Sequence, residues 1–229
     1  MRKKTVPVLI LIFFVCVFCS EALCAKTPPV FPLDKSSVNA FDSLIMRPYS
    51  KTIDKTATVL EACALLSPAV LLLQPSAQYV KIGIMYLETA AAAWGLKEVL
   101  KSLVCRPRPY MYFEGYPQSK VDSGDWDDSF PSGHTTMSFA GASFASYVFA
   151  KYNPDSKWKF PVALASYAIA GTTAALRVAG GNHFMTDILA GALIGTAIGI
   201  GVPALHTLFS NTDAEVSVSP FGLVFSLSL

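Results

Sequence analysis

The apolar positions of this chain gather into five long stretches separated by shorter polar segments. They run from about residues 57 to 73, 79 to 104, 132 to 150, 160 to 176 and 187 to 205. We interpret each stretch as a helix. The last one contains Ile188–Leu205, which carries no charged residue, and a bilayer span needs about 17–25 residues. The pattern therefore predicts an all-α fold, a bundle of about five to six mostly transmembrane helices.

A sixth apolar segment lies at the N-terminus. Arg2, Lys3 and Lys4 precede an apolar run over residues 6–18, and small residues follow at positions 22 and 25. A basic start, an apolar run and small residues are typical of a secretory signal. We therefore expect residues 1–25 to be a signal peptide or an uncleaved signal anchor, with the chain behind it outside the cytoplasm.

The polar segments complete the domain organisation. Residues 26–55 are polar and contain several prolines, so we expect an exposed lead-in before the helical domain of residues 56–207. The tail of residues 208–229 alternates apolar and small polar residues, which indicates a strand-like or disordered end.

The charged linker between the third and fourth helices suggests a topology. If the N-terminus is inside and all six apolar segments span, Lys151, Lys157 and Lys159 lie on the cytoplasmic side, as the positive-inside rule prefers. The loops at residues 105–131 and 177–186 then lie outside. The prediction is an integral protein of a bacterial-type cell envelope, with its active site at the extracytoplasmic, periplasmic end of the bundle.

Composition agrees with a membrane protein. Hydrophobic residues make up 52% of the chain and charged residues 15%, whereas charged residues are about 25% of a typical soluble domain. The net charge of +2 is too small to indicate a nucleic-acid partner. Outside the N-terminal segment only Cys63 and Cys105 remain, which excludes a disulfide framework. A bridge between them is possible, but we expect two unpaired, buried thiols.

The first candidate for chemistry is Ser132-Gly133-His134, which follows Pro131 at the start of the third helix. Backbone amides at a helix N-terminus are unpaired and bind an oxyanion well. Ser132 can act as cap and ligand, and Gly133 allows close approach to the backbone. The alternative is an ordinary helix start with an exposed histidine.

The second candidate is Arg177, followed by His183 and then Asp187 where the last helix begins. Residues four apart share one helix face. A carboxylate bonded to one imidazole nitrogen fixes the tautomer and makes the other nitrogen a better nucleophile or base. Arg177 offers a planar cation suited to phosphate. The alternative is a surface salt link at a helix end.

The third candidate is Lys101, followed by Arg108-Pro109 after six residues. These cations end a helix that delivers them to the same outside face. Cations at a helix C-terminus can also simply interact with the dipole. Arg106-Pro107 is a near-duplicate, so the preference for Arg108 rests on spacing alone.

Together, in this order and with these gaps, the three segments resemble the three-part signature of the type 2 phosphatidic acid phosphatase and vanadium haloperoxidase superfamily. The resemblance covers about residues 57–205. One departure is Leu176, which precedes Arg177 at a position where the family usually has serine.

The resemblance implies a role for each signature residue. His183 would attack phosphorus, oriented by Asp187, and His134 would protonate the leaving oxygen and later activate water. The phosphate oxygens would be held by Lys101, Arg108, Ser132, Gly133 and Arg177. No metal or other cofactor is expected, because two histidines and one engaged aspartate make a poor metal site.

Several activities share such a pocket. We predict a membrane lipid phosphatase acting on phosphatidic acid, phosphatidylglycerophosphate, undecaprenyl pyrophosphate or lipid A. The alternatives are a soluble periplasmic acid phosphatase, a vanadium haloperoxidase, or a non-catalytic membrane protein that binds phospholipid. The particular substrate and the oligomeric state stay open.

Three further features carry smaller expectations. Glu88, inside an apolar helix, is expected to pair internally. Glycines at four-residue spacing in the last helix either allow close helix approach or are merely tolerated there; they are Gly191, Gly195 and Gly199. The aspartates before Pro131 are expected to form a solvated loop; they are Asp122, Asp125, Asp127 and Asp128.

Overall fold

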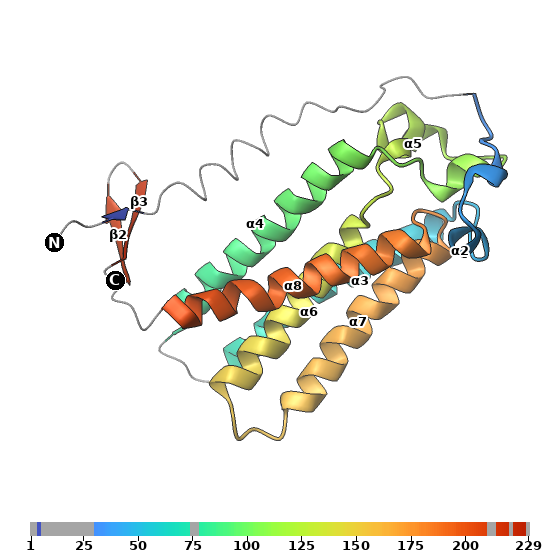
Figure 1. Cartoon of the computed structure of the whole chain (residues 1–229). Coiled ribbons are helices and arrows are strands. Elements are labelled where there is room, and N and C mark those ends of the chain that lie inside the picture. Colours follow the sequence, from blue (N-terminus) through green and yellow to red (C-terminus); the bar gives the residue numbers. More distant parts are fainter. Residues whose placement is uncertain (1–3, 6–29, 74–77, 210–213, 220–221, 228–229) are drawn as a thin grey trace.

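The computed structural model describes residues 4–5, 30–73, 78–209, 214–219 and 222–227, and the fold is dominated by five long helices (Figure 1). These are α3 (Lys51–Leu65), α4 (Tyr79–Val104), α6 (Gly133–Tyr152), α7 (Lys159–Ala179) and α8 (Met185–Phe209). The predicted all-α bundle is confirmed. The first helix begins at Lys51, before the polar lead-in was expected to end.

Shorter elements connect and extend the bundle. A 3₁₀ segment, η2 (Ser67–Leu73), continues α3. The lead-in and the α4–α6 connection contain the remaining short helices: η1 (Lys35–Ser37), α2 (Ala40–Ser43), η3 (Pro109–Tyr112), α5 (Gln118–Asp122) and η4 (Asp125–Asp127). The tail, expected to be strand-like or disordered, contains the strands β2 (Ala214–Ser219) and β3 (Gly222–Leu227). They form a sheet of order β1-β3-β2 with β1 (Lys4–Thr5) from the N-terminus. The rest of the predicted signal segment of residues 1–25 lies outside the described residues.

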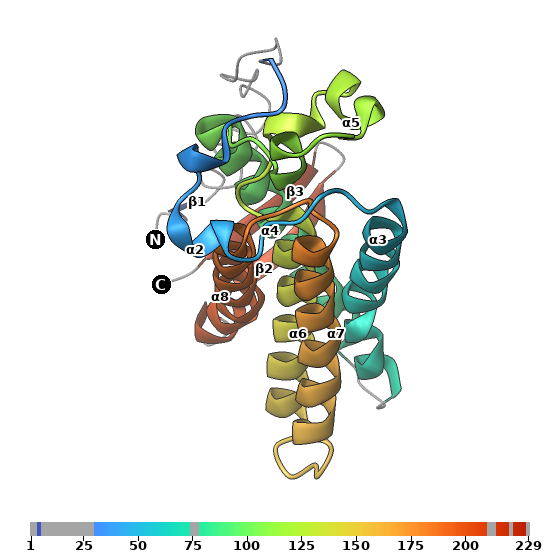
Figure 2. The same cartoon turned by 90° about the vertical axis from the view of Figure 1, so that its right-hand side faces the viewer.

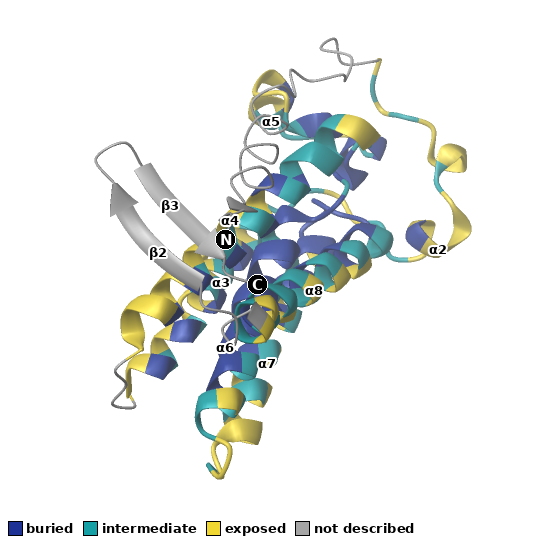
Figure 3. Cartoon of the chain, turned by 60° about the vertical axis from the view of Figure 1, so that its left-hand side comes forward, coloured by how far each residue is buried: buried dark blue, intermediate teal, exposed yellow. Residues whose placement is uncertain are grey.

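Helix α6 is the centre of the bundle. It contacts α3, α4, α7 and α8, and Figure 2 shows it running alongside α7 down to the turn that joins them. Buried residues line the interior, while the outer faces of α3 and α7 are exposed (Figure 3). Because α6 is surrounded by other helices and not by lipid, small side chains that allow close packing suit it better than large apolar ones. This explains its moderate apolarity.

The glycines of α8 lie against the backbone of α6. A Cβ atom at Gly195 would come within 2.2 Å of the carbonyl oxygen of Thr136, and one at Gly199 within 2.5 Å of that of Ala140. At Gly191 the distance to the Ser132 carbonyl oxygen would be 2.8 Å. Real Cβ atoms do not approach so closely, so these glycines are required for helix contact and are not merely tolerated.

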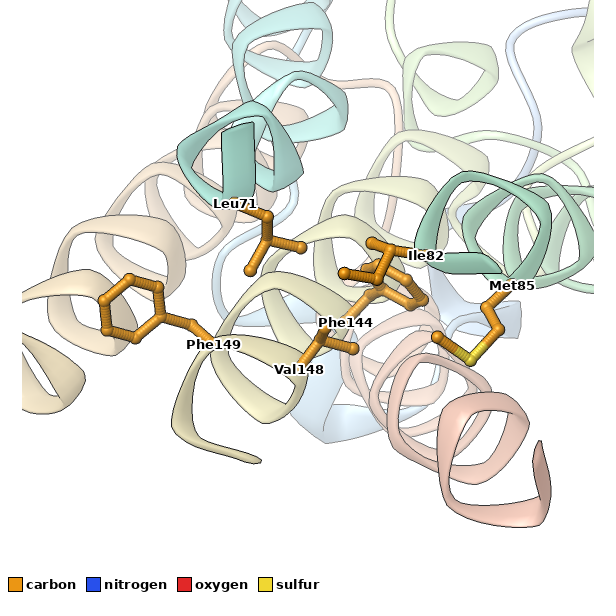
Figure 4. Packing of buried hydrophobic residues seen from close by; sticks show 6 residues of the cluster. All are labelled: Leu71, Ile82, Met85, Phe144, Val148 and Phe149. Atoms are coloured by element: carbon orange, nitrogen blue, oxygen red, sulfur yellow. The ribbon is translucent and has the colours of Figure 1, made fainter. Parts of the chain in front are cut away.

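At the end of α6 far from His134, larger side chains fill the core (Figure 4). The cluster joins η2, α4 and α6 and consists of Leu71, Ile82, Met85, Phe144, Val148 and Phe149. Between α4 and α8, Glu88 forms an ion pair with His206. The prediction that Glu88 pairs internally is therefore confirmed.

Three helical segments are long and apolar enough to cross a membrane: Lys51–Leu73, Lys159–Ala179 and Met185–Leu208. They carry large exposed apolar side chains, among them Val59, Leu164 and Leu193. These features support an integral membrane protein. Helices α4 and α6, which were also expected to span, are not among these three.

The cysteine prediction is wrong. Cys63 is an exposed free thiol. Cys105 is disulfide-bonded, with a partner outside the described residues. Only the cysteines outside the N-terminal segment enter the sequence-based prediction. Cys63 is therefore the only partner that it considers for Cys105.

We predict that Gly195→Ala lowers the free energy of unfolding, because the new methyl group would overlap the Thr136 carbonyl. Overpacking of this kind costs about 1–3 kcal/mol. Denaturant unfolding of detergent-solubilised protein measures the change. The control is Gly201→Ala on the same helix, where nothing lies within 4 Å of the added Cβ. Equal stability of the two variants would contradict the close α6–α8 contact.

Candidate active site

A cavity of about 280 Å³ lies at one end of the bundle, between the helices and the loops that join them. Helices α3, α4, α6 and α7 contribute to its wall. Six of the eight residues predicted from the sequence line it, namely Lys101, Arg108, Gly133, His134, Arg177 and His183. The other two, Ser132 and Asp187, are fully buried and do not line the cavity. The fold thus brings the three motifs together.

His183 lies in the turn between α7 and α8 and is almost fully buried. Its Nδ1 is 2.8 Å from the carbonyl oxygen of Ser129, and its Nε2 is 3.1 Å from an Arg108 guanidinium nitrogen. A carbonyl only accepts and a guanidinium only donates, so Nδ1 carries the proton and Nε2 presents its lone pair. Burial, reinforced by Arg108 and Arg177, keeps the pKa of His183 well below its usual value. The imidazole is therefore neutral.

Asp187 holds His183 indirectly. Its Oδ2 is 3.8 Å from Nδ1 of His183, too far for the direct hydrogen bond that the spacing suggested. Instead Oδ2 accepts hydrogen bonds from the Ser129 hydroxyl at 2.6 Å and from the Phe184 amide at 2.8 Å. A carboxylate in the first turn of a helix commonly accepts the free amide before it. Asp187 therefore fixes the Ser129 segment, whose carbonyl orients the imidazole.

Arg106 and Arg108 have different positions. Arg108 lines the cavity and donates to Asp125, at 2.6 Å to the carbonyl oxygen and 2.5 Å to the carboxylate. Arg106 is not among the lining residues; it is 2.5 Å from Asp187 and 2.7 Å from Asp42. Its guanidinium also lies 4.1 Å from the ring centre of Phe184. The geometry agrees with the preference for Arg108 that rested on spacing.

Asp42 ties the lead-in to the site. Most of residues 30–50 are exposed or half-buried, as expected, but Asp42 is fully buried. Besides Arg106, its carboxylate accepts hydrogen bonds from the amide and hydroxyl of Thr186 at 2.9 and 2.7 Å. Although burial opposes ionisation, Arg106 and these hydrogen bonds lower the pKa of Asp42.

The start of α6 is capped as predicted. Ser132 Oγ accepts hydrogen bonds from the amide and hydroxyl of Thr135, at 3.4 and 2.9 Å. Gly133 lines the cavity, and a Cβ atom there would lie 3.2 Å from the side chain of Lys97. Gly133 therefore leaves room for a cation beside the helix N-terminus.

Arg177 is buried and incompletely bonded. It forms an ion pair with Asp54, and its Nε has no hydrogen-bond partner in the described part of the chain. A buried N–H group without an acceptor lowers the stability of the fold, and a bound ligand that accepts its hydrogen bond would remove this cost. Lys101 lies farther from its carboxylate neighbour, at 3.7 Å from Asp128. Arg177 is thus a cation whose hydrogen bonding an oxyanion can complete, and Lys101 lines the same cavity.

Six further lining residues were not identified as site residues from the sequence: Asp54, Thr58, Glu61, Lys97, Lys120 and Asp125. The aspartate loop is not simply solvated, which corrects the sequence-based expectation. Asp127 is buried, and Asp125 pairs with Arg108 and Lys120. Burial raises the pKa of Asp125, but Arg108 and Lys120 outweigh it and hold that pKa below its usual value.

No group of three or more His, Cys, Asp or Glu side chains is placed to share a metal ion within the described residues. The expectation of a metal-free site stays a prediction. Three carboxylates do line the cavity, Asp54 and Glu61 from α3 and Asp125 from the α4–α6 connection.

Comparison with known proteins identifies the family. The sequence model of the PAP2 superfamily matches residues 82–210, more than half of the chain. The chain belongs to the PAP2 superfamily. The matched region contains all three motifs and begins inside α4, so α3 lies before it.

Individual PAP2-related proteins share part of the chain. A probable diacylglycerol pyrophosphate phosphatase 1 of Schizosaccharomyces pombe is 37% identical over 123 residues, 44% of each chain. A PA-phosphatase related-family protein of Dictyostelium discoideum is 38% identical over 91 residues, 36% of this chain and 33% of that protein. The chain therefore spans less than half the length of either relative.

A solved structure supports the PAP2 fold. The crystal structure of Aquifex aeolicus LpxE aligns with a TM-score of 0.50 and 22% identity, covering 75% of this chain and 99% of that one. At this identity the likeness concerns the arrangement of helices alone.

We predict that Arg106→Ala destabilises the PAP2 fold by about 3–5 kcal/mol, as is typical when one partner of a buried ion pair is removed. The carboxylates of Asp42 and Asp187 are fully buried and would lose their cation. Denaturant unfolding checks this. Arg47→Ala, which removes an exposed arginine of the lead-in, should change stability by no more than about 0.5 kcal/mol. Similar unfolding of both variants would mean that Arg106 is not a structural cation.

Proposed function

We propose that the protein is a phosphatase that hydrolyses a phosphate monoester or pyrophosphate of a lipid through a phosphohistidine on His183, without a metal ion. The observation that carries this proposal is the buried, neutral His183. Its unprotonated Nε2 lies beside Arg108 in a cavity that is also lined by Lys101 and Arg177. A nucleophile surrounded by fixed cations is suited to phosphoryl transfer.

In the first step Nε2 of His183 attacks phosphorus while the bond from phosphorus to the leaving oxygen breaks. The departing oxygen takes a proton from His134. In the second step water attacks phosphorus, His134 accepts a proton from that water, and the P–N bond breaks with its electron pair returning to Nε2. Phosphate leaves and both histidines return to their starting states.

The cations stabilise the charge that develops on phosphorus. Lys101, Arg108 and Arg177 reach the cavity from α4, the following loop and α7. The Gly133 segment adds the amide end of α6. Because these groups are already positioned, little reorganisation is needed in the transition state.

A lipid substrate is supported by the apolar helices and by the relatives. Three segments are long and apolar enough to cross a membrane, and the cavity lies at the end of the bundle that they share. The Schizosaccharomyces pombe relative is named for the phosphatase of a lipid pyrophosphate. Candidate substrates are phosphatidic acid, phosphatidylglycerophosphate, undecaprenyl pyrophosphate and lipid A.

We further propose that the site faces the extracytoplasmic side. The linker bearing Lys151, Lys157 and Lys159 joins α6 to α7 at the opposite end of the bundle (Figure 1), and such a basic linker favours the cytoplasm. Cys105, which follows α4 at the site end, is disulfide-bonded. Disulfides persist in oxidising compartments.

The phosphohistidine is tested by trapping with a radiolabelled phosphate ester followed by alkaline denaturation, which preserves phosphohistidine. Label is expected on wild-type protein and not on His183→Ala. The control is His206→Gln, since His206 pairs with Glu88 far from the cavity. Label on His183→Ala, or its absence from wild type during turnover, would contradict the intermediate.

The substrate class is tested by phosphate release from detergent-purified protein. The panel contains the four candidate lipids and p-nitrophenyl phosphate. Preference for one lipid, lost in His183→Ala, would support a lipid phosphatase and identify its substrate. Equal or better hydrolysis of the small ester, by protein recovered without detergent, would indicate a soluble acid phosphatase instead.

The metal-free mechanism predicts that EDTA leaves the rate unchanged. Arginine and lysine side chains supply the positive charge that a metal ion would otherwise provide. Phosphate release is measured before and after chelation and again with added magnesium. Loss of turnover in EDTA with recovery in magnesium would refute this part of the proposal.

A further inference from the structure

One wall of the cavity is formed by α3, which precedes the region matched by the PAP2 family model. Asp54, Thr58 and Glu61 all line the cavity. Their spacing of four and then three residues places them on one face of the helix. The signature motifs assign no role to these residues.

Glu61 and Thr58 contact the same nitrogen of His134. Nε2 of His134 is 3.2 Å from a carboxylate oxygen of Glu61 and 3.1 Å from the hydroxyl oxygen of Thr58. The Thr58 hydroxyl donates its own proton to the Asp54 carbonyl at 3.1 Å, so toward His134 it can only accept. A carboxylate also only accepts. Nε2 of His134 therefore carries a proton, and Nδ1 is the nitrogen left to exchange one.

The position of Glu61 is fixed by the packing of α3 on α6. Ala57 and Ala64 are fully buried. A Cβ atom at Gly141 of α6 would lie only 2.6 Å from the Ala64 carbonyl oxygen, so the two backbones are in close contact. Glu61 lies one turn from that contact, so the packing fixes the position of its backbone beside His134.

The cations around His134 act against its protonated form. Lys97 and Lys101 of α4 and Arg177 of α7 line the same cavity. Their positive charges and the burial of the ring disfavour a protonated His134, whereas general acid catalysis requires the proton. Burial and Arg177 hold the pKa of His134 below its usual value, and Glu61 is the carboxylate in direct contact with the ring whose negative charge acts against that shift.

We propose that Glu61 is a positioning residue for His134, which it holds by Nε2–H and supports in the protonated form that delivers a proton from Nδ1 to the leaving oxygen. This inference rests on the proposed function, since it assigns to His134 the role of acid. In the first step the Nδ1–H bond of His134 breaks as the new O–H bond forms on the leaving group. The proton between Nε2 and Glu61 stays with the pair.

The leaving group provides a selective test. A lipid alcohol departs poorly without a proton, while p-nitrophenolate departs readily. We expect Glu61→Gln to lower kcat/KM for the lipid substrate roughly 10- to 100-fold, within the range of general acid catalysis, and to change kcat/KM for p-nitrophenyl phosphate less than about threefold. Glu61→Asp should recover part of the loss. The control is Glu114→Gln, an exposed loop carboxylate, which should leave both values unchanged.

Two outcomes would overturn the proposal. Equal losses on both substrates would indicate that Glu61 only supports the fold. If Glu61→Gln left kcat/KM for the lipid unchanged or raised it, Glu61 would merely compete with the substrate phosphate for the cations of the cavity.

A second measurement does not require turnover. With ¹⁵N-labelled imidazoles, His134 is expected to show a protonated Nε2 in wild-type protein and to lose this preference in Glu61→Gln. Variants of the other two histidines, His183 and His206, assign the signals. An unchanged His134 tautomer in Glu61→Gln would refute the pairing. Failure of the wild type to hydrolyse any substrate would count against the proposed function, and the tautomer would still decide the role of Glu61.

Discussion

The backbone contact between α6 and α8 is the constraint on which the site depends. Glycines 191, 195 and 199 let the two helices meet along several turns, at distances that exclude any side chain. At the site end of this contact the Ser132 amide donates to the Asp187 carbonyl at 3.1 Å. The starts of both helices are thereby placed in register, so His134 and His183 line one cavity although about 50 residues separate them in the sequence.

The cations of the cavity would repel one another if they were not balanced. In the structure, Asp54 pairs with Arg177 and Lys120, and Asp125 pairs with Arg108 and Lys120. These carboxylates allow the positive groups to be held close together without a ligand. They also impose a condition on binding, because an incoming phosphate must compete with them for the arginines. A dianionic group that contacts several cations at once satisfies this condition better than a single charge.

Much of this arrangement could be predicted from the sequence, and the rest could not for physical reasons. Uninterrupted apolar length identified the helices, and motif spacing separated Arg108 from Arg106. The spacing of His183 and Asp187 predicted a shared helix face but not which atoms bond, because the Ser129 carbonyl competes successfully for Nδ1. Glu61 was visible as a charge in an apolar helix. Its partner could be recognised only once the packing of α3 on α6 was known.

The two histidines of the cavity differ in what holds them, and this difference separates their chemistry. His183 is bonded through Nδ1 to a neutral carbonyl, which fixes the tautomer, and through Nε2 to a cation, which favours the uncharged ring. His134 is in contact with the Glu61 carboxylate, which favours the charged ring. Burial and cationic neighbours lower the pKa of both histidines, but only His134 has a carboxylate within hydrogen-bond distance that opposes this shift. The proposed phosphoryl transfer needs an unprotonated His183 at the moment when His134 has a proton to give, so the carboxylate beside His134 acts in the direction that the proposal requires.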